Sequence, residues 1–416
     1  MLVPKLRFKR EDGTEYPEWT GSLFGEYCKT IDLRTSDTDS FPLYSLTIED
    51  GVTPKTDRYV RDYLITKEGD SYKIVPDGAF VYNPMNLRFG AIKPNRSGIS
   101  VCVSGYYDVF YIGIKETLAF WENYLTTPNM LNYYDRIATG SLIEKKRVYY
   151  SEFQKINKPL PCLEEQQKIA DFLSTVDEVI AQSEAEVQNL EQQKKAAMQK
   201  IFSQEVRFKR EDGTEYPEWE ERQLDSFCDI ITKQTGFDYT KTIKGALLTE
   251  QQDNTLPYLQ TKNFSGVNFN YLTDYYIPTE VANQFSKIIL DRQCLLFSIV
   301  GASVGNIALF PNTVKCFLSG AICVAKPSIV EQTAYLYYFM CSENGQSQIR
   351  NATKGSGQAT ITIEDIRLFT IATPCLEEQQ KIADFLSAYD EAISYAKQEL
   401  DKWKELKKGL LQQMFV

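Results

Sequence analysis

The sequence predicts an α+β protein in which two pseudo-repeated α/β domains are separated by two long antiparallel coiled-coil helices. One observation is that R-F-K-R-E-D-G-T-E-Y-P-E-W occupies residues 7–19 and recurs unchanged at 207–219. Another is that P-C-L-E-E-Q-Q-K-I-A-D-F-L-S occupies 161–174 and recurs at 374–387. Identities of this length indicate two copies of one unit. Between the repeats, short β-rich runs alternate with Gly, Asn, Asp and Pro, which is typical of strands joined by turns.

The repeats divide the chain into six predicted segments. In chain order these are an N-terminal repeat segment (1–19), a first variable domain (20–160), a central helix (161–203), a second repeat segment that serves as a linker (204–219), a second variable domain (220–373) and a C-terminal helix (374–416).

The composition is that of an ordinary globular chain. Its 416 residues are 43% hydrophobic, which is enough for two or more domains. No apolar run is long enough to span a membrane, and the N-terminus lacks the apolar core of a signal peptide. The nine cysteines are scattered singly, a usage that fits a reducing cytosol. We therefore expect a cytoplasmic protein.

The chain contains no histidine. This excludes Ser-His-Asp and Cys-His catalysis and zinc sites that use histidine, while catalysis by carboxylates or lysine stays open. Two cysteine pairs recur at matched positions, Cys28 with Cys228 and Cys162 with Cys375. Small buried residues are the favoured interpretation of these pairs, and metal ligands are the alternative. We predict no catalytic residue and no metal ligand.

The two variable domains differ strongly but align at short anchor sequences. For example, L-Y-x-x-T at 43–47 resembles P-Y-x-x-T at 257–261. The numbering offset between the copies shows that the second domain carries a net insertion of about 14 residues between Ile231 and Thr255. This stretch is rich in Thr, Lys and Gln, and we predict that it forms a loop.

Each variable domain contains several predicted strands and one aromatic-rich helical stretch. The strand-like runs are A-F-V-Y (79–82), I-S-V-C-V (99–103) and D-V-F-Y-I (108–112) in the first domain, and C-L-L-F-S-I-V (294–300), N-I-A-L-F (306–310) and A-I-C-V-A (321–325) in the second. The helical stretches cover residues 118–134 and 333–348. Together they predict an α+β domain in each copy.

Two short motifs resemble catalytic signatures. V-Y-N-P-M-N at 81–86 is similar to the N-P-P-[YF] motif of DNA adenine methyltransferases, but it lacks the second proline and the following aromatic residue. We predict a turn at the end of a strand. G-A-S-V-G at 301–305 is too short for a phosphate loop, and no G-K-[ST] follows it. We predict a tight turn there as well.

Each P-C-L-E-E-Q-Q sequence opens a predicted helix of about 38 residues. Acidic residues in its first turn favour a helix N-terminus, and seam positions then alternate by four and three for more than four heptads. The predicted seam positions are Ile169, Leu173, Val176, Ile180, Ser183, Val187, Leu190, Lys194, Ala197 and Ile201 in the first helix, and Ile382, Leu386, Tyr389, Ile393, Ala396, Leu400, Trp403, Lys407, Leu410 and Met414 in the second. We predict an intramolecular antiparallel pair; the alternative is that each helix packs on its own domain.

Two further expectations concern this helical frame. Lys194 and Lys407 interrupt the seams at matched positions. We expect them near the edge of the seam, where they snorkel or meet acids on a partner; simple solvation is the alternative. Pseudo-twofold symmetry also places residues 4–19 against the C-terminal end of the second helix, near 410–415, so that the chain is nearly circular. The alternative is a frayed N-terminal tail.

The net charge of −10 argues against DNA binding until its distribution is considered. Residues 159–202 carry four basic and eight acidic side chains, whereas residues 51–100 carry eight basic and five acidic ones. Phosphate binding needs a local basic patch rather than a net positive charge. The variable domains therefore remain candidates for DNA binding together with a more basic partner.

Taken together, these features resemble the specificity (S) subunit of a type I restriction–modification system. The resemblance covers the whole chain and is carried by the P-C-L-E-E-Q-Q-K-I-A-D-F-L repeat, by C-L-L-F-S-I-V-G-A-S-V-G-N-I at 294–307 and by G-S-G-Q-A-T-I at 355–361. It implies a non-catalytic protein whose two target recognition domains each read one half-site of a bipartite double-stranded DNA target. It also implies two methyltransferase subunits on the helices, with restriction (motor) subunits joining through them. S-adenosylmethionine, ATP and Mg²⁺ would be used by these partners, and no cofactor by this chain.

We predict DNA contacts mainly at lysines and arginines for phosphates and at polar side chains for base edges. In the first domain the predicted residues are Arg58, Arg61, Lys73, Arg88, Lys93, Arg96, Lys145, Lys146 and Arg147. In the second domain they are Lys241, Lys244, Lys262, Asn263, Ser298, Ser303, Lys354, Ser356 and Gln358.

Two other classes of function are the alternatives. A non-enzymatic coiled-coil scaffold would keep the helices but bind no nucleic acid, and sequence-specific DNA retention separates it from a specificity subunit. A stand-alone restriction or methyl-transfer enzyme is disfavoured, because the sequence has no methyl-donor motif, no phosphate loop and no D…E-x-K nuclease cluster.

Overall fold

The computed structural model describes residues 4–55, 72–140, 146–355 and 359–415, and the chain forms two compact units. The first unit contains residues 1–184 and 398–416, and the second contains residues 185–397. The boundary crosses both long helices, so each unit holds one variable domain and one half of each helix. Within the described ranges, no helix has both the length and the apolar character needed to cross a membrane.

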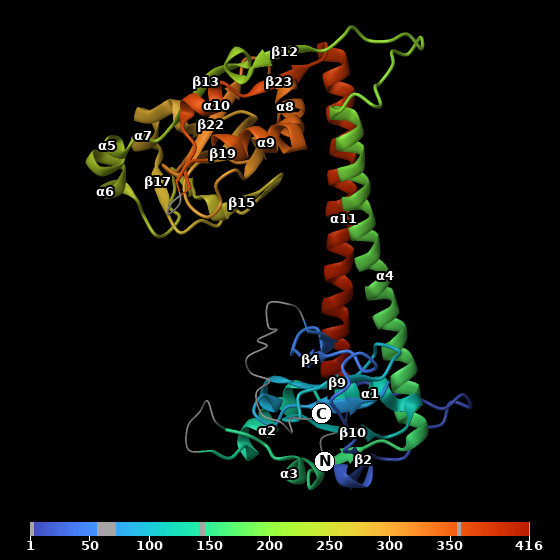
Figure 1. Cartoon of the computed structure of the whole chain (residues 1–416). Coiled ribbons are helices and arrows are strands. Elements are labelled where there is room, and N and C mark those ends of the chain that lie inside the picture. Colours follow the sequence, from blue (N-terminus) through green and yellow to red (C-terminus); the bar gives the residue numbers. More distant parts are fainter. Residues whose placement is uncertain (1–3, 56–71, 141–145, 356–358, 416) are drawn as a thin grey trace. The chain divides into compact units, whose positions relative to one another are not determined.

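The two long helices are α4 (Leu163–Phe202, 40 residues) and α11 (Leu376–Met414, 39 residues). Both begin inside the repeated P-C-L-E-E-Q-Q sequence and are close to the predicted length. All predicted seam positions are buried or partly buried. The two helices pack together (Figure 1), so the predicted helix pair is confirmed.

Salt bridges between the helices give their direction. In the first unit, Asp177 pairs with Lys407 at 2.5 Å and Glu184 with Lys404 at 2.8 Å. Moving along α4 toward its C-terminus therefore means moving toward the N-terminus of α11, which makes the pair antiparallel.

The second unit repeats this pattern. Glu191 pairs with Lys397 at 2.7 Å, and Lys194 with Asp390 at 2.6 Å. The two seam lysines thus do meet acids, but the acids lie on the other helix of the same chain, which corrects the expectation of a partner chain.

The first domain is built from antiparallel sheets. A four-stranded sheet has the order β2 (Cys28–Ile31), β10 (Asp108–Ile112), β7 (Phe80–Tyr82), β8 (Ile92–Pro94). A three-stranded sheet has the order β3 (Arg34–Thr35), β6 (Tyr72–Val75), β9 (Val101–Val103). Two further pairs are β1 (Thr20–Leu23) with β11 (Asn157–Leu160) and β4 (Tyr44–Leu46) with β5 (Val52–Pro54). The helices are α1 (Leu118–Tyr124), α2 (Pro128–Ile137) and α3 (Tyr150–Gln154).

The second domain contains a matching four-stranded antiparallel sheet and a second sheet of its own. The matching sheet has the order β13 (Cys228–Lys233), β22 (Ile322–Pro327), β19 (Cys294–Ser298), β20 (Ile307–Phe310). The second has the order β17 (Tyr276–Pro278), β14 (Thr255–Leu259), β21 (Cys316–Leu318), β18 (Ile289–Leu290), with β14 and β21 parallel. Two further pairs are β12 (Glu220–Gln223) with β23 (Thr370–Thr373) and β15 (Phe264–Ser265) with β16 (Asn268–Phe269). The longer helices are α8 (Thr333–Cys341) and α9 (Glu343–Ala352), and the short ones are α7 (Thr279–Ala282) and α10 (Ile363–Arg367).

Each of the six predicted strand runs contains a strand. Each aromatic-rich stretch, by contrast, is two helices rather than one. The chain restarts at a polar cap in both copies: the side chain of Thr127 accepts a hydrogen bond from the Met130 amide, and that of Ser342 from the Gly345 amide. An N-cap satisfies amides that the start of a helix leaves unpaired, so the break is built into the sequence.

The insertion in the second domain is helical, and the predicted loop is wrong. It forms α5 (Gly236–Asp238), a π-helical turn (Tyr239–Ile243) and α6 (Lys244–Ala246). The hydroxyl of Thr235 accepts a hydrogen bond from the Asp238 amide at 3.1 Å and caps the first turn. Ile243 is fully buried in the core of the domain, so one apolar anchor fixes a segment that is otherwise polar.

Both short motifs form turns, as predicted. The side-chain oxygen of Asn83 accepts a hydrogen bond from the Met85 amide at 3.0 Å, just after β7. Gly301 and Gly305 have φ values of +90° and +89°, which side chains with a Cβ rarely adopt.

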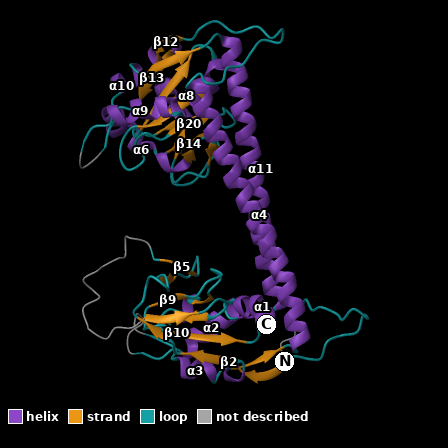
Figure 2. Cartoon of the chain, turned by 45° about the vertical axis from the view of Figure 1, so that its right-hand side comes forward, coloured by secondary structure: helices purple, strands orange, loops and turns teal. Residues whose placement is uncertain are grey.

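The C-terminal ends of the two long helices are buried in the cores of the variable domains. Met414 and Phe415 join the core of the first domain, and Ile201 and Phe202 join the core of the second. The amide of Leu6 donates to the carbonyl of Gln413 at 3.0 Å. The described part of the N-terminal segment therefore lies against the C-terminal end of α11 (Figure 2), which confirms the predicted closure.

Candidate nucleic-acid interface

The repeated segments meet in a buried contact at the start of α4. The guanidinium of Arg7 donates to both carboxylate oxygens of Glu165, at 3.0 and 2.7 Å, and Trp19 Nε1 donates to the same carboxylate at 3.1 Å. Glu165 has no exposed surface. A buried carboxylate is tolerated only when it is paired and hydrogen-bonded. The hydrogen bond to Glu165 raises the pKa of Arg7.

The second copy reproduces this contact. Arg207 donates to Glu378 at 3.2 and 2.8 Å, and Trp219 Nε1 donates at 3.1 Å. Glu378 is also fully buried. The contact joins one repeated sequence to the other, which explains why both repeats are needed: together they attach each variable domain to the start of a long helix.

Several cations predicted to contact DNA in the first domain are held by carboxylates of that domain. Lys73 pairs with Asp108 at 3.4 Å and Arg88 with Asp135 at 3.2 Å, and both cationic side chains are only 11% exposed. These two residues are largely committed to packing within the domain.

The remaining predicted contacts of the first domain are more accessible. Lys93 and Arg96 share Glu122, at 3.7 and 2.6 Å, and the side chain of Arg96 is 52% exposed. Lys146 is half-buried, and the Arg147 guanidinium lies 5.9 Å from the ring of Tyr149. Arg58, Arg61 and Lys145 lie outside the described residues. The DNA contacts of this domain stay predictions.

The predicted contacts of the second domain divide by burial. Asn263 is 5% exposed and Ser298 has no exposed surface, so both of these predicted base contacts are covered in this conformation. Ser303 is half-buried.

The lysines among the predicted contacts of the second domain are exposed. Lys262 pairs with Asp274 and Lys354 with Asp365, and their side chains are 58% and 65% exposed. Lys241 lies 5.2 Å from the ring of Phe237. Ser356 and Gln358 lie outside the described residues.

One pocket of the second domain combines side chains that can bind base edges with side chains that can bind phosphates. We call it the insertion pocket; its volume is about 720 Å³, and it is lined by Lys233, Gln234, Thr235, Gly236, Tyr239, Lys244, Leu247, Tyr258, Gln260, Thr261, Tyr275, Ser319, Gly320 and Ala321. The helical insertion forms one wall. The ends of β13, β14 and β21 supply Gln234, Gln260 and Ser319. Two lysines, two glutamines and three tyrosines around one hollow suit a nucleic acid, which needs cations for phosphates and amides for base edges.

Of this set, the sequence pointed only to Lys244. Gln234 and Gln260 were not among the predicted contacts. Gln234 lies in the stretch that was predicted to be a loop, and Gln260 lies inside the P-Y-x-x-T anchor sequence. A usable signal was the comparison of the two copies: Gln260 occupies the position of Leu46, so an amide replaces an apolar residue between the matched Tyr and Thr of the anchor.

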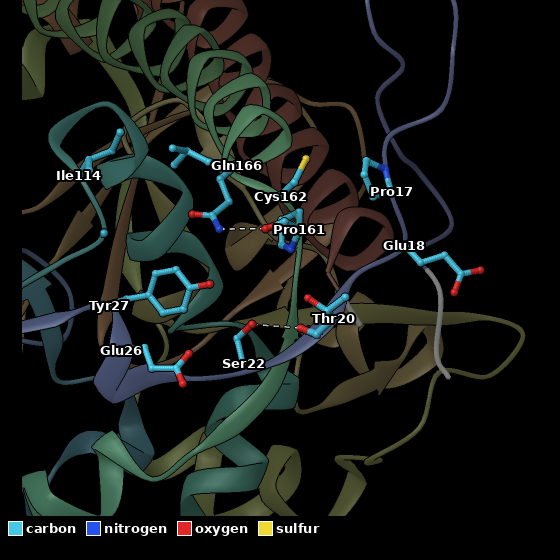
Figure 3. Close-up of a pocket in the computed structure, with 12 residues that line it drawn as sticks. Pro17, Glu18, Thr20, Ser22, Glu26, Tyr27, Ile114, Pro161, Cys162 and Gln166 are labelled. Carbon is cyan, nitrogen blue, oxygen red and sulfur yellow. Dashed lines mark hydrogen bonds between the residues drawn. The ribbon is translucent and has the colours of Figure 1, made fainter.

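A different pocket lies where the first repeat segment meets the start of α4 (Figure 3). Its volume is about 460 Å³, and its lining includes Glu18, Glu26, Ile114 and Leu163 but no lysine or arginine. Ile114 and Leu163 are 46% and 54% exposed. Carboxylates and exposed apolar groups do not suit a phosphate backbone, but they do suit a protein surface.

Comparison with known proteins identifies the family of the chain. The family model described as the type I restriction modification DNA specificity domain matches residues 97–192 and 216–404. The chain belongs to this family.

Similar specificity proteins are known from archaea. The MjaX protein of Methanocaldococcus jannaschii is 25% identical over 342 residues, which cover 80% of this chain and 71% of that protein. The MjaVIII type I restriction enzyme specificity subunit of the same organism is 25% identical over 279 residues, which cover 62% of this chain and 61% of that subunit.

Solved structures share the fold of this specificity protein. The S subunit of a type I restriction–modification system from M. genitalium aligns with a TM-score of 0.61 at 14% identity, covering 100% of this chain and 99% of that one. A chain from a study of the assembly of a type I restriction–modification system aligns with a TM-score of 0.54 at 16% identity, covering 96% and 98%. Two variable domains on a duplicated helical frame are therefore an architecture that this chain shares with them.

Proposed function

We propose that this chain is the subunit that gives a type I restriction–modification complex its DNA sequence specificity. Each variable domain reads one half-site of a bipartite double-stranded target. The observation that carries the proposal is a duplicated frame that holds two unlike domains. The Arg–Glu–Trp contact is reproduced within 0.2 Å in the two copies, whereas the insertion pocket depends on a segment that only the second copy has.

We also propose that two copies of one partner bind the frame, and that these are methyltransferase subunits through which restriction subunits join. Matched apolar residues support this. Ile114 and Ile329, each just before the 3₁₀ turn ahead of an aromatic helix, are 46% and 44% exposed, and Leu163 and Leu376 at the helix starts are 54% and 43% exposed. A doubled apolar surface suits a partner that binds twice in the same way.

The chain itself is proposed to be non-catalytic. S-adenosylmethionine, ATP and Mg²⁺ would then act in the partners. In the part of the chain that the structure describes, no group of three or more Cys, Asp or Glu residues is arranged to hold a metal ion.

A binding selection tests the proposal against a scaffold that ignores DNA. The complex of the chain with its methyltransferase subunits is incubated with a library of random duplexes, and the retained duplexes are sequenced. The proposal predicts two short specified sequences separated by an unspecified spacer of constant length. Retention without any sequence preference would contradict it.

A further inference from the structure

The walls of the insertion pocket carry three buried polar atoms that lack a hydrogen-bond partner in the described structure: Gln234 Nε2, Gln260 Oε1 and Ser319 Oγ. Gln234 is 4% exposed and Ser319 is 7% exposed. Buried polar groups are nearly always paired, because the loss of water is otherwise uncompensated. A set of unpaired groups around one hollow therefore indicates a ligand that completes the pairing.

The orientation of the Gln234 amide follows from its neighbour. The hydroxyl of Tyr258 donates to Gln234 Oε1 at 3.1 Å. Burial raises the pKa of Tyr258 to about 12, so this hydroxyl keeps its proton near neutral pH and remains a donor. The amide oxygen of Gln234 is thus occupied, and its NH₂ group, which carries two donors, is left without a partner.

Gln260 offers the opposite chemistry. Its backbone is fixed at the end of β14, because its amide donates to Asn263 Oδ1 and its carbonyl accepts from the Asn263 amide, both at 2.9 Å. The side-chain oxygen that remains unpaired is an acceptor. The pocket therefore presents one amide donor and one amide acceptor from the ends of two strands that belong to different sheets.

Only one base presents the complementary pair on its own major-groove edge. Adenine has the N7 acceptor beside the N6 amino donor, guanine has two acceptors, cytosine has a donor, and thymine has an acceptor and a methyl group. We propose that Gln234 and Gln260 read one adenine in the half-site bound by the second domain. Gln234 donates to N7, and Gln260 accepts from the N6 amino group. Lys233 and Lys244 of the same pocket are placed to meet flanking phosphates.

This inference rests on the proposed function and deepens it. Both amide atoms are covered in the free chain, so the groups over them move aside when DNA binds, while the hydrogen bond from Tyr258 keeps the Gln234 amide in its orientation. The first domain has Leu46 at the position that matches Gln260, and Leu46 is a buried apolar residue. The adenine reading is therefore specific to the second half-site.

The test uses the complex of the chain with its methyltransferase subunits. Sequencing the methylated sites of cells that carry this system gives the wild-type motif. Duplexes are then made in which each adenine of the second-domain half-site is replaced in turn by 7-deazaadenine, which lacks only the N7 acceptor. We expect binding to weaken about tenfold at one adenine, the effect of losing a base contact. If every substituted duplex binds like the parent, the inference is wrong.

The variant Gln234→Met completes the test, because methionine keeps the length of the side chain and loses the amide. The variant complex should bind the parent duplex about tenfold more weakly and should no longer distinguish 7-deazaadenine from adenine at that position. The exposed Gln284 provides the control Gln284→Met, which should behave like the wild type. A Gln234→Met complex that still distinguishes the two bases contradicts the assignment. Absence of any bipartite motif for the wild type would instead overturn the proposed function.

Discussion

At the scale of single residues, the duplicated contact between Arg7, Glu165 and Trp19 explains why the sequence contains two pairs of identical repeats. A guanidinium and an indole N–H converge on a carboxylate with no exposed surface. Breaking such a pair from one side leaves a buried charge uncompensated, whereas replacing both charged partners by apolar residues is close to neutral.

We predict that Glu165→Leu destabilises the first unit by about 3 kcal/mol, the lower end for breaking a buried ion pair. The double variant Arg7→Met with Glu165→Leu should recover most of this loss. Urea unfolding followed by tryptophan fluorescence in a Trp219→Phe background measures both, because Trp19, Trp121 and Trp403 all lie in the first unit. The matched change Glu378→Leu is the control, because it should leave the transition of the first unit unchanged. A cost below about 1 kcal/mol for Glu165→Leu would mean that the contact is not a stabilising one.

The repeats were visible in the sequence, but their structural role was not. The sequence indicated two copies of a unit, yet nothing in R-F-K-R-E-D-G-T-E-Y-P-E-W specifies that its arginine reaches a glutamate 158 positions away. The same limit explains the DNA contacts. Lys73 and Arg88 were chosen by charge, and only the fold reveals that Asp108 and Asp135 already pair with them.

At the scale of secondary structure, the two seam lysines occupy matched positions but differ in burial. Lys194 and Asp390 are 16% and 18% exposed, and Asp390 also accepts a hydrogen bond from Tyr338 at 2.7 Å. Lys407 and Asp177 are 24% and 42% exposed. Ion pairs gain strength as solvent is excluded, and exposed ones contribute little.

We predict that Lys194→Glu lowers the stability of the second unit by about 1 to 2 kcal/mol, more than an exposed ion pair is worth. The matched Lys407→Glu should cost the first unit less than about 1 kcal/mol. Combining Lys194→Glu with Asp390→Lys should restore part of the loss. Thermal unfolding at low and high salt measures these effects. Equal costs at the two positions would contradict the difference in burial.

The helices and strands were largely predictable because their signals are local. Heptad spacing and acidic first turns identified α4 and α11 to within a few residues. The β-rich runs identified β7 and β10 in the four-stranded sheet of the first domain and β19, β20 and β22 in the matching sheet of the second, but not β2, β8 or β13. The insertion was missed because its polar composition resembles a loop, while its helical turns depend on a cap at Thr235 and on burial of Ile243. Burial by the rest of the domain is not visible in a local pattern.

At the scale of the whole molecule, the first unit contains both ends of the chain. The Leu6 amide donates to Gln413, and Phe415 packs against Phe120 and Tyr124 in the core of the first domain. Termini that lie close together allow a chain to be rejoined and opened elsewhere.

We predict that a permuted chain folds and binds its partners when its two termini are joined by a short linker and it is opened after Gln204. Gln204 lies in the exposed turn after α4, with a φ of +59°, so opening the chain there releases an unfavourable backbone conformation. Co-purification with the methyltransferase subunits and a thermal melt within a few degrees of the parent are the expected results. Aggregation of the permutant with several linker lengths would argue against closure of the frame.

The central claim is that two independent readers are held on one duplicated frame. The measurement that tests it most directly replaces residues 20–158 by the corresponding domain of another member of the family and maps the methylated sites of cells carrying the hybrid. The account predicts that one half of the bipartite motif changes, while the other half, read by the second domain, stays the same. A hybrid that methylates DNA with both halves changed would contradict it.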